Sequence, residues 1–340
     1  MKINMKKKIL PLLFVVLAAI AVYLLFFKKP TSEQRTNLYT LNDTLAINKI
    51  ILNTPQNLGV SLYRSDTGWV LNAKLKADPN LVNQLIKTAQ RLKVSYTLNE
   101  KESKSVIAEV KKDGSQVSYF DKNNVLLKRY WVGRAAANNV GSYFWDGTSA
   151  VAQVCYLPNL NGFLDFRFNV NEAEWRDRTI FNTNLDMIKS LTVDYIGLPQ
   201  HSFHIEVHQQ DSFSLTQLHA NKPISLGPIN RQRVFQYLSF YKRISSEGFN
   251  NDNPKRDSVL QSVPFCTVSL TDFNNKTTYV ALHQRPLNKR SKARENALGQ
   301  SLEYDVDRYW ADINNGADLV VVQQFVFGKL LRRFDEFYNR

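Results

Sequence analysis

Residues 116–132 (QVSYFDKNNVLLKRYWV) and residues 266–283 (CTVSLTDFNNKTTYVALH) follow one plan, and this pair of stretches decides the expected fold. Each has two runs of alternating apolar residues around a turn rich in Asp, Asn and Lys, the pattern of an antiparallel β-hairpin. A second hairpin pattern follows each, at residues 142–156 (SYFWDGTSAVAQVCY) and 308–322 (RYWADINNGADLVVV). The sequence therefore predicts two arrays of mainly antiparallel strands.

A strand and an amphipathic helix precede each hairpin array. The opening strands begin at Ile47 and Ile188, and the helices are expected at residues 79–93 and 228–243. Asp78 stands at the N-cap of the first helix, with a proline directly after it. The repeated order predicts an α+β fold with two tandem copies of one strand, helix and hairpin unit, behind an N-terminal transmembrane helix.

The two expected copies differ in length. The offset between matching residues grows from 141 at Ile47 and Ile188 to 165 at Trp145 and Trp310, so copy two carries an insertion. Much of the insertion is expected in the basic loop at 285–300. The predicted domains are a tail and span at 1–29, a linker at 30–46, copy one at 47–170, a junction at 171–187 and copy two at 188–340.

The N-terminal part of the chain predicts a membrane span. Residues 9–27 (ILPLLFVVLAAIAVYLLFF) form an uncharged run long enough to cross a bilayer as a helix. The small-x-small pattern at residues 19–21 leaves a cleaved signal peptide as the alternative, but it lies inside the apolar run, which favours an uncleaved signal anchor. More lysines precede the span than follow it, which indicates a cytoplasmic N-terminus and a body in the periplasm or outside.

Charge and cysteine content exclude some classes of function. Six lysines and no acids lie in residues 1–29, which leaves a net charge of +8 for the exported part. A moderate excess in that compartment argues against nucleic acid and leaves anionic lipid or an acidic protein as partners. Cys155 and Cys266 each lie in an apolar run, and we expect two buried thiols rather than a disulfide.

The stretch NEAEWRDRTIF at residues 171–181 lies between the expected copies. Three readings are open: a structural junction, a ligand clamp or a catalytic carboxylate. The junction is favoured because a lone carboxylate beside arginines lacks a second acid, a nucleophile or a metal. In this reading Trp175, Ile180 and Phe181 pack into the contact between copies, while Arg176 and Arg178 flank Asp177 in an ion-pair cluster.

These motifs carry a resemblance to a known family. The apolar anchor, an Ile-x-x-Ile strand, a hairpin ending in Val132-Gly133 and the WRDRTIF stretch together resemble the uncharacterised bacterial family called domain of unknown function 4340. The likeness covers most of copy one and the junction, and WRDR is its most specific element. It implies no catalytic residues, and it implies a setting beside ABC-type exporter subunits and gliding-motility-like auxiliary membrane proteins.

Two further stretches are candidate binding sites. His204, Glu206 and His208 alternate in HSFHIEVH and would share one face of a strand, which is the spacing of a weak metal site. The alternative is that the apolar residues between them form the buried face and leave the histidines facing water. The loop RPLNKRSKAR could dock on anionic lipid or an acidic partner, or be a solvated loop, through Arg285, Lys289, Arg290, Lys292 and Arg294.

No phosphate-binding loop, nucleophile elbow, dinucleotide fingerprint or Cys-x-x-Cys motif occurs in the sequence. The aromatic pairs Phe144-Trp145 and Tyr309-Trp310 are expected in the core rather than in a sugar platform, and the acids at residues 305, 307 and 312 on a solvated hairpin. We therefore expect a non-catalytic auxiliary or scaffold subunit of a membrane complex, without a cofactor. The alternatives are an envelope-binding module for peptidoglycan or polysaccharide, and an enzyme.

Overall fold

The computed structural model describes residues 36–339, apart from residues 57, 138, 210–211, 220–226 and 290. The expected transmembrane span at residues 9–27 lies outside this range. None of the helices in the described part of the chain has the length and apolar character required to span a bilayer. The chain divides into two compact units, and the boundary lies between Arg176 and Asp177. We call these parts unit 1 and unit 2.

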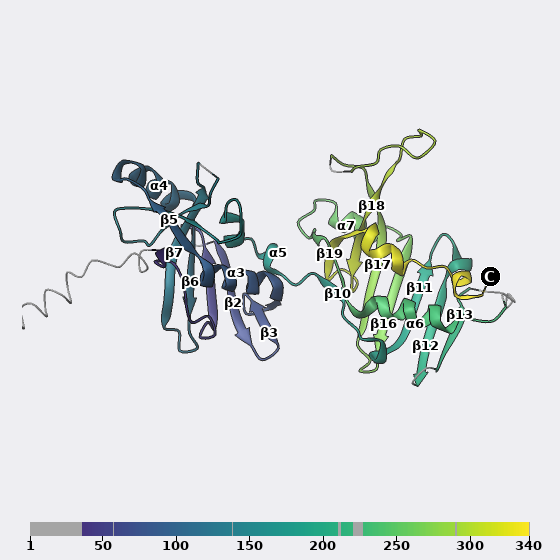
Figure 1. The fold of residues 1–340 in the computed structure, drawn as a ribbon. Helices are drawn as coiled ribbons and strands as arrows, with labels where there is room; N and C mark the ends of the chain where they lie inside the picture. The colour runs from purple at the N-terminus through teal and green to yellow at the C-terminus, as the bar shows by residue number, and fades with distance from the viewer. Residues whose placement is uncertain are drawn as a thin grey trace, which may run out of the picture. The chain divides into compact units, whose positions relative to one another are not determined.

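In the described part of unit 1, nine strands form one antiparallel sheet in the order β4-β3-β2-β1-β6-β7-β8-β9-β5 (Figure 1). The strands are β1 (Lys49–Asn53), β2 (Gly59–Ser65), β3 (Gly68–Leu71), β4 (Leu75–Lys76), β5 (Lys93–Thr97), β6 (Ser115–Phe120), β7 (Leu126–Ala135), β8 (Ser142–Trp145) and β9 (Gln153–Tyr156). The hairpins expected at 116–132 and 142–156 are confirmed as β6-β7 and β8-β9.

Two helices cover the two faces of this sheet. Helix α3 (Pro79–Arg91) begins at the expected N-cap, where the Asp78 side chain accepts a hydrogen bond from the amide of Asn80. Its apolar stripe packs in a core that includes Phe144. Helix α4 (Glu100–Asp113) packs instead with Trp145 and its neighbours. Because adjacent strand residues point to opposite faces, the two helices lie on opposite sides of the sheet.

In the described part of unit 2, eight strands form a second antiparallel sheet in the order β13-β12-β11-β16-β17-β18-β19-β15. The strands are β11 (Ile188–Tyr195), β12 (Phe203–Gln209), β13 (Ser212–Gln217), β15 (Gly248–Phe249), β16 (Cys266–Asp272), β17 (Thr277–Pro286), β18 (Tyr304–Ile313) and β19 (Asp318–Gln323). A short separate pair is formed by β10 (Thr179–Phe181) and β14 (Ile244–Ser245). The hairpins expected at 266–283 and 308–322 are confirmed as β16-β17 and β18-β19.

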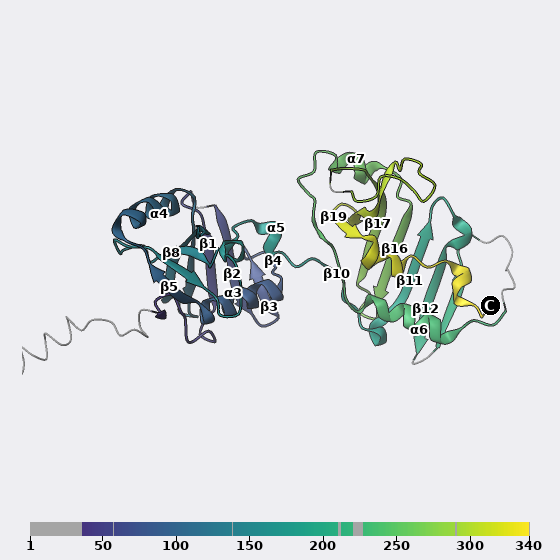
Figure 2. The same ribbon diagram turned by 45° about the horizontal axis from the view of Figure 1, so that its top comes forward.

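Helices also cover both faces of the second sheet. Helix α6 (Arg231–Ser239) packs on the larger core, which contains Ala311 and Val320. The opposite face carries Trp310 and Leu319 with helix α7 (Arg256–Gln261), and Figure 2 shows α6 and α7 at different ends of the sheet. The helix expected at 228–243 is shorter than predicted, because a 3-10 turn (Phe240–Lys242) follows α6.

The two sheets share one connection order. In unit 1, the four strands β1 to β4 precede α3, a strand after α3 pairs at the far edge with β9, and α4 leads into β6 beside β1. In unit 2, three strands precede α6, β15 pairs at the far edge with β19, and α7 leads into β16 beside β11. The expected mixed class, with mainly antiparallel sheets, is confirmed.

Several side chains occupy places that the sequence pattern did not fully predict. Tyr39 and Leu41, in the expected linker, are buried in the core of unit 1. Asp305 and Asp312, expected on a solvated hairpin, are 2% and 7% exposed, so that expectation is wrong for both. The two thiols are buried and unpaired as expected, and burial raises the pKa of each. Phe144, Trp145 and Trp310 are buried, as core packing predicts.

Candidate functional site

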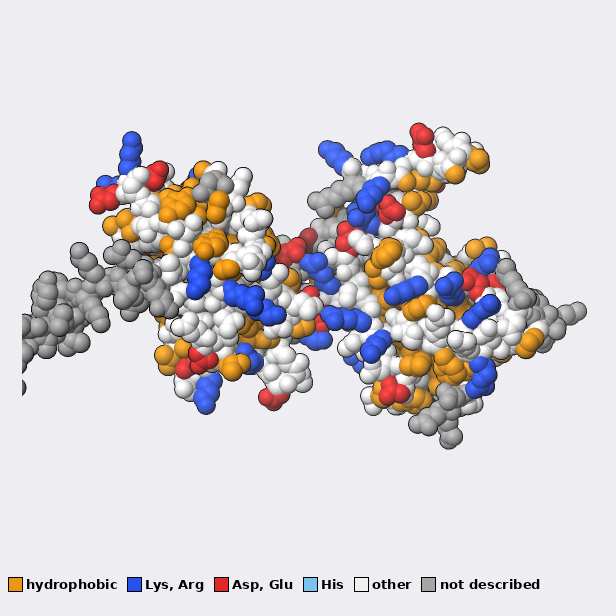
Figure 3. Space-filling view, viewed as in Figure 1, with side chains coloured by type: hydrophobic (Ala, Val, Ile, Leu, Met, Phe, Trp, Pro, Cys, Tyr) orange, Lys and Arg blue, Asp and Glu red, His pale blue; other side chains and the backbone are white. Residues whose placement is uncertain are grey.

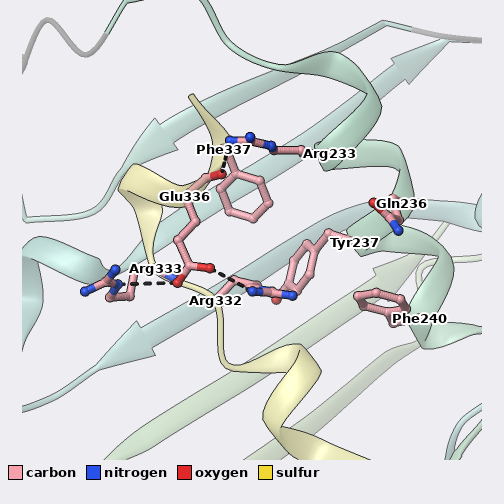
Figure 4. A pocket seen from close by; sticks show the side chains of 8 residues that line it. All are labelled: Arg233, Gln236, Tyr237, Phe240, Arg332, Arg333, Glu336 and Phe337. Atoms are coloured by element: carbon pink, nitrogen blue, oxygen red, sulfur yellow. Dashed lines mark hydrogen bonds and ion pairs between the residues drawn. The ribbon is translucent and has the colours of Figure 1, made fainter. Parts of the chain in front are cut away.

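The candidate site is a groove in unit 2 between helix α6 and the C-terminal segment, shown in Figure 4. Its volume is about 520 Å³. The segment contains two 3-10 turns, η5 (Gly328–Leu330) and η6 (Phe334–Phe337). We call this cavity the α6 groove, and its lining residues are Arg233, Gln236, Tyr237, Phe240, Arg332, Arg333, Glu336 and Phe337.

Aromatic rings form the floor of the α6 groove. Tyr237 and Phe337 are each 2% exposed, and their ring centroids lie 5.2 Å apart in an edge-to-face arrangement. The Tyr237 hydroxyl donates to the Leu330 carbonyl at 2.7 Å. Burial raises the pKa of Tyr237 well above its usual value, so its phenol stays neutral and joins the helix to the C-terminal segment. The ammonium of Lys329 lies 5.3 Å from the ring of Phe240 at the rim.

Glu336 holds two arginines at the groove. The Arg332 Nη1 atom lies 2.8 Å from Glu336 Oε2, and the Arg333 Nε atom lies 3.3 Å from Oε1. The backbone amide of Arg333 also donates to Oε1, at 3.2 Å, so the Glu336 side chain caps the start of η6. These spacings of three and four residues bring the charges together on one turn. Both arginines are therefore oriented before any ligand binds.

A third arginine ties the helix to the end of the chain. Arg233 Nη1 donates to the carbonyls of Tyr338 at 2.7 Å and Glu336 at 3.4 Å. Figure 4 shows Arg233 beside the ring of Phe337, and Arg332 on the side of Tyr237. Guanidinium groups next to aromatic rings suit acidic side chains and other anions, which they contact through several donors. The lining therefore has three cations, one carboxylate and an apolar floor.

The sequence did not reveal this groove. Its rim joins residues of α6 to residues about a hundred positions later, and Arg233 and Tyr338 are 105 residues apart. The available signal was RRFDEF at residues 332–337, where basic and acidic residues alternate with two phenylalanines near the chain end. This signal marks an ion-paired turn, but it does not say which helix the turn covers.

The junction residues belong to two different cores. Trp175 is 4% exposed, packs in the core of unit 1, and donates from Nε1 to the Asn169 carbonyl at 2.7 Å. Phe181 is 1% exposed and packs in the core of unit 2, with its ring centroid 5.0 Å from that of Tyr241. Ile180 packs against the same core. The two aromatic residues of the motif therefore anchor the two ends of the connection separately.

The charged residues of the junction also contact their own units. Arg176 forms an isolated antiparallel bridge with Ala77 in unit 1. In unit 2, the Asp177 Oδ1 atom accepts from the Thr179 amide at 3.0 Å and from its hydroxyl at 2.7 Å. Arg178 donates to the Glu247 carbonyl at 2.8 Å. These contacts fix the local path of the chain on either side of the boundary between the units.

The histidine strand has the burial pattern of an ordinary sheet strand. Phe203 and Ile205 are fully buried, while Glu206 and His208 are exposed. The Nδ1 atom of His204 lies 2.9 Å from the Thr192 hydroxyl of the neighbouring strand. Within the described residues, no group of three or more His, Cys, Asp or Glu side chains is arranged to hold a metal ion.

The predicted basic loop extends from the end of the β17-β18 hairpin, and Figure 1 shows it projecting from the sheet. Arg285 is not free for docking, because it lies 3.5 Å from the buried carboxylate of Asp305. The Ser291 hydroxyl donates to the same carboxylate at 2.8 Å. Lys289, Lys292 and Arg294 are exposed, and Arg290 lies outside the described residues. The root of the loop is therefore a fixed polar cluster and not a solvated chain.

No protein-family model matches this chain, and no curated protein and no solved structure matches it either. Function is therefore inferred from geometry and sequence pattern.

Proposed function

We propose that the chain is a non-catalytic, membrane-anchored scaffold subunit that holds partner proteins in a membrane complex. In this proposal the body consists of two copies of one α+β unit and lies outside the cytoplasm. The observation that carries it is the α6 groove, an open and charged surface with an apolar floor, on a unit whose strand order resembles that of unit 1 apart from the added edge strand β4. Such a surface suits the docking of another protein's acidic segment.

The repeated architecture supports a duplication. Apart from the edge strand β4 of unit 1, both sheets connect their strands and covering helices in the same order along the chain. In each unit a 3-10 turn that follows the last hairpin packs near the first covering helix, and a groove lies along that helix. A duplicated unit with two separate binding surfaces is a common way to build a scaffold, because each copy can hold a different partner.

The titratable groups support binding rather than catalysis. Catalytic groups are expected in clefts, with pKa values shifted by burial together with a specific charged partner. Among the described residues, the largest upward pKa shifts belong to buried tyrosines and thiols, and burial is the main cause of each. Their hydroxyl groups contact one another inside the cores, as Tyr119 and Tyr130 do at 3.2 Å. These groups stabilise the units, and Tyr237, which has the same kind of shift and lies in the floor of the α6 groove, has no carboxylate among the causes of its shift.

The membrane setting rests on the sequence. The apolar run at 9–27 and the lysines before it support an uncleaved signal anchor with the body in the periplasm or outside. The resemblance carried by WRDRTIF supports an ABC-type export or gliding-motility-like complex as the assembly. Protease added outside spheroplasts should digest the body of the chain. A body that resists protease until the membrane is permeabilised would reverse this topology.

The scaffold role is tested by purifying the native complex in mild detergent and identifying the membrane proteins that come with it. Arg332→Gln removes one guanidinium from the rim of the α6 groove, and we expect it to release a specific partner while unit 2 stays folded. Lys255→Gln is the matched control, because Lys255 is exposed and does not line this groove. A partner set that is the same in both variants would contradict docking at the α6 groove.

A second candidate is an envelope-binding module for peptidoglycan or polysaccharide. The groove along α3 favours it, because several side-chain amides line that groove and amides recognise sugar hydroxyls through paired donors and acceptors. Two measurements separate the two candidates. One is sedimentation of the chain with isolated cell-wall sacculi, and the other is retention of partner proteins in the native complex. Binding to sacculi without any copurifying protein would favour the second.

A further inference from the structure

A second groove lies in unit 1, along helix α3. It has a volume of about 480 Å³ and is bounded by α3 and by the segment that follows β9. That segment ends in a 3-10 turn, η1 (Asp165–Phe168). Figure 3 shows Lys and Arg side chains gathered over this part of unit 1. We call it the α3 groove, and its lining residues are Asn80, Asn83, Gln84, Lys87, Thr88, Arg91, Leu157, Pro158, Asn159, Leu160 and Arg167.

Arg167 is a partly buried cation without a carboxylate partner among the described residues. Its Nε atom is buried and makes no hydrogen bond to the protein. Its Nη1 atom reaches only the Thr88 hydroxyl, at a long 3.4 Å. The guanidinium carbon lies 5.3 Å from the ring of Phe166. Burial lowers the pKa of Arg167, yet an arginine keeps its charge at neutral pH, so this charge costs stability unless an anion offsets it.

Two more cations face the same groove. Lys87 and Arg91 are exposed and four residues apart on α3, so they share one side of the helix with Asn80 and Gln84. Like charges at this spacing repel each other. Neither makes an ion pair with a described residue, and the lining contains no acid. The α3 groove therefore concentrates three positive charges that the described protein does not neutralise.

We propose that the α3 groove binds a phosphate group carried by a polyhydroxy molecule, such as a phosphorylated polyol or sugar. A doubly charged tetrahedral oxyanion balances most of the three positive charges, whereas a carboxylate would balance one. The groove is larger than a single ion, and the amides of Asn80, Asn83, Gln84 and Asn159 can bind hydroxyl groups beside the phosphate. Arg167 contacts the phosphate, and Lys87 and Arg91 draw it in. This site goes beyond the scaffold role and does not depend on it.

The test uses the full-length chain in an uncharged polyoxyethylene detergent. Thermal unfolding of unit 1 is followed with inorganic phosphate, glycerol 3-phosphate and acetate at equal ionic strength. We expect glycerol 3-phosphate to stabilise unit 1 most, inorganic phosphate less, and acetate least. Micelles that contain phosphatidylinositol 4-phosphate, whose inositol carries a phosphate monoester beside free hydroxyls, distinguish a lipid headgroup from a soluble ester at the same phosphate concentration. Tighter binding in the micelle than of glycerol 3-phosphate would identify a lipid source.

Arg167→Gln is the decisive variant. Without ligand it should unfold at the same temperature as the wild type or at a higher one, because a poorly compensated charge is removed. Its dissociation constant for glycerol 3-phosphate should rise by at least about tenfold, because a charge-assisted contact is lost. Lys101→Gln, at an exposed lysine of α4 that lines neither groove, is the matched control and should leave phosphate binding unchanged.

Three results would overturn the proposal. The first is equal stabilisation of the wild type and of Arg167→Gln by glycerol 3-phosphate. The second is stabilisation by acetate as large as that by glycerol 3-phosphate, which would make the site a carboxylate site. The third is a large loss of unit 1 stability in ligand-free Arg167→Gln with unchanged binding, which would make Arg167 a structural residue.

Discussion

The α3 groove and the α6 groove are built alike and differ in charge. In each unit a 3-10 turn after the last sheet hairpin ends in a buried phenylalanine, Phe168 in η1 and Phe337 in η6. The residue before that phenylalanine lines the groove, and it is Arg167 in unit 1 and Glu336 in unit 2. The residues that precede these two phenylalanines therefore carry opposite charge.

The two grooves therefore differ in whether their arginine and lysine side chains are paired with a carboxylate. In the α6 groove, Glu336 accepts from Arg332 and Arg333, so the arginines are held in place and partly neutralised. In the α3 groove, Arg167 adds a charge to Lys87 and Arg91 without offering an acceptor. The backbone provides the cavity, and a single side chain decides whether its charges are paired within the protein or are left for a ligand.

The largest expected effect concerns the two cores that the junction connects. Trp175→Ala should destabilise unit 1 by about 3–5 kcal/mol, because truncating a large buried aromatic leaves a cavity. Phe181→Ala should have a similar effect on unit 2 alone. Calorimetry of the full-length chain, with separate transitions for the units, measures both. Asp177→Asn spares both cores and serves as the control, and a loss of both transitions in Trp175→Ala would contradict independent cores.

The next prediction concerns a substitution that gives the α6 groove unpaired positive charges, as in the α3 groove. Glu336→Gln removes the negative charge that Arg332 and Arg333 share, and it should destabilise unit 2 by about 1 kcal/mol, as expected for partly exposed ion pairs. The freed arginines should give the α6 groove a measurable affinity for inorganic phosphate. Glu295→Gln, an exposed acid on the projecting loop, is the control. No gain of phosphate binding would show that ion pairing is not what separates the grooves.

A smaller effect is expected from pH, and only in unit 2, because every histidine of the sequence lies after residue 176. Burial lowers the pKa of His283, while the nearby Asp312 raises it and so offsets part of the shift. The unfolded chain therefore binds a proton more readily, and the free energy of unfolding of unit 2 should fall as pH drops below about 6.5.

Calorimetry between about pH 7.5 and pH 5.5 measures this dependence before most carboxylates titrate. His283→Gln should reduce the dependence, whereas His208→Gln should retain it, because His208 is exposed. The His283 Nδ1 atom lies 2.9 Å from the Ser262 hydroxyl, so the glutamine can keep a polar contact there. An equal fall in both units would mean that another group carries the pH dependence.

The smallest effect is expected on the histidine strand. Replacing His204 and His208 together with alanine should change the stability of unit 2 by about 0.5 kcal/mol. The effect is small because His208 is exposed and His204 makes a single part-buried hydrogen bond, to Thr192. Thermal unfolding with and without zinc provides the measurement. Stabilisation of the wild type by zinc, lost in the double variant, would establish a metal site on this strand.

The sequence predicted the elements that are fixed by local patterns. The hairpins β6-β7 and β16-β17 followed from alternation around polar turns, and the start of α3 followed from Asp78 and the proline after it. Prediction from the sequence was less successful where residues distant in the chain decide whether a side chain is buried. Asp305 lies in a polar hairpin but is buried, because Arg285 and Ser291 satisfy its carboxylate.

The sequence by itself determined the mixed class with mainly antiparallel sheets, the positions of the main strands and helices, and the buried thiols. These properties depend on residues a few positions apart, whose periodicity selects a strand or a helix. Only the tertiary structure decided the two grooves and the charge in each of them. Each groove lies between a helix and a segment much later in the chain. The hydrogen bond from Arg233 to the Tyr338 carbonyl is an example of such a distant contact. A local pattern cannot specify such a contact, because the same turn could pack against any apolar face of suitable shape.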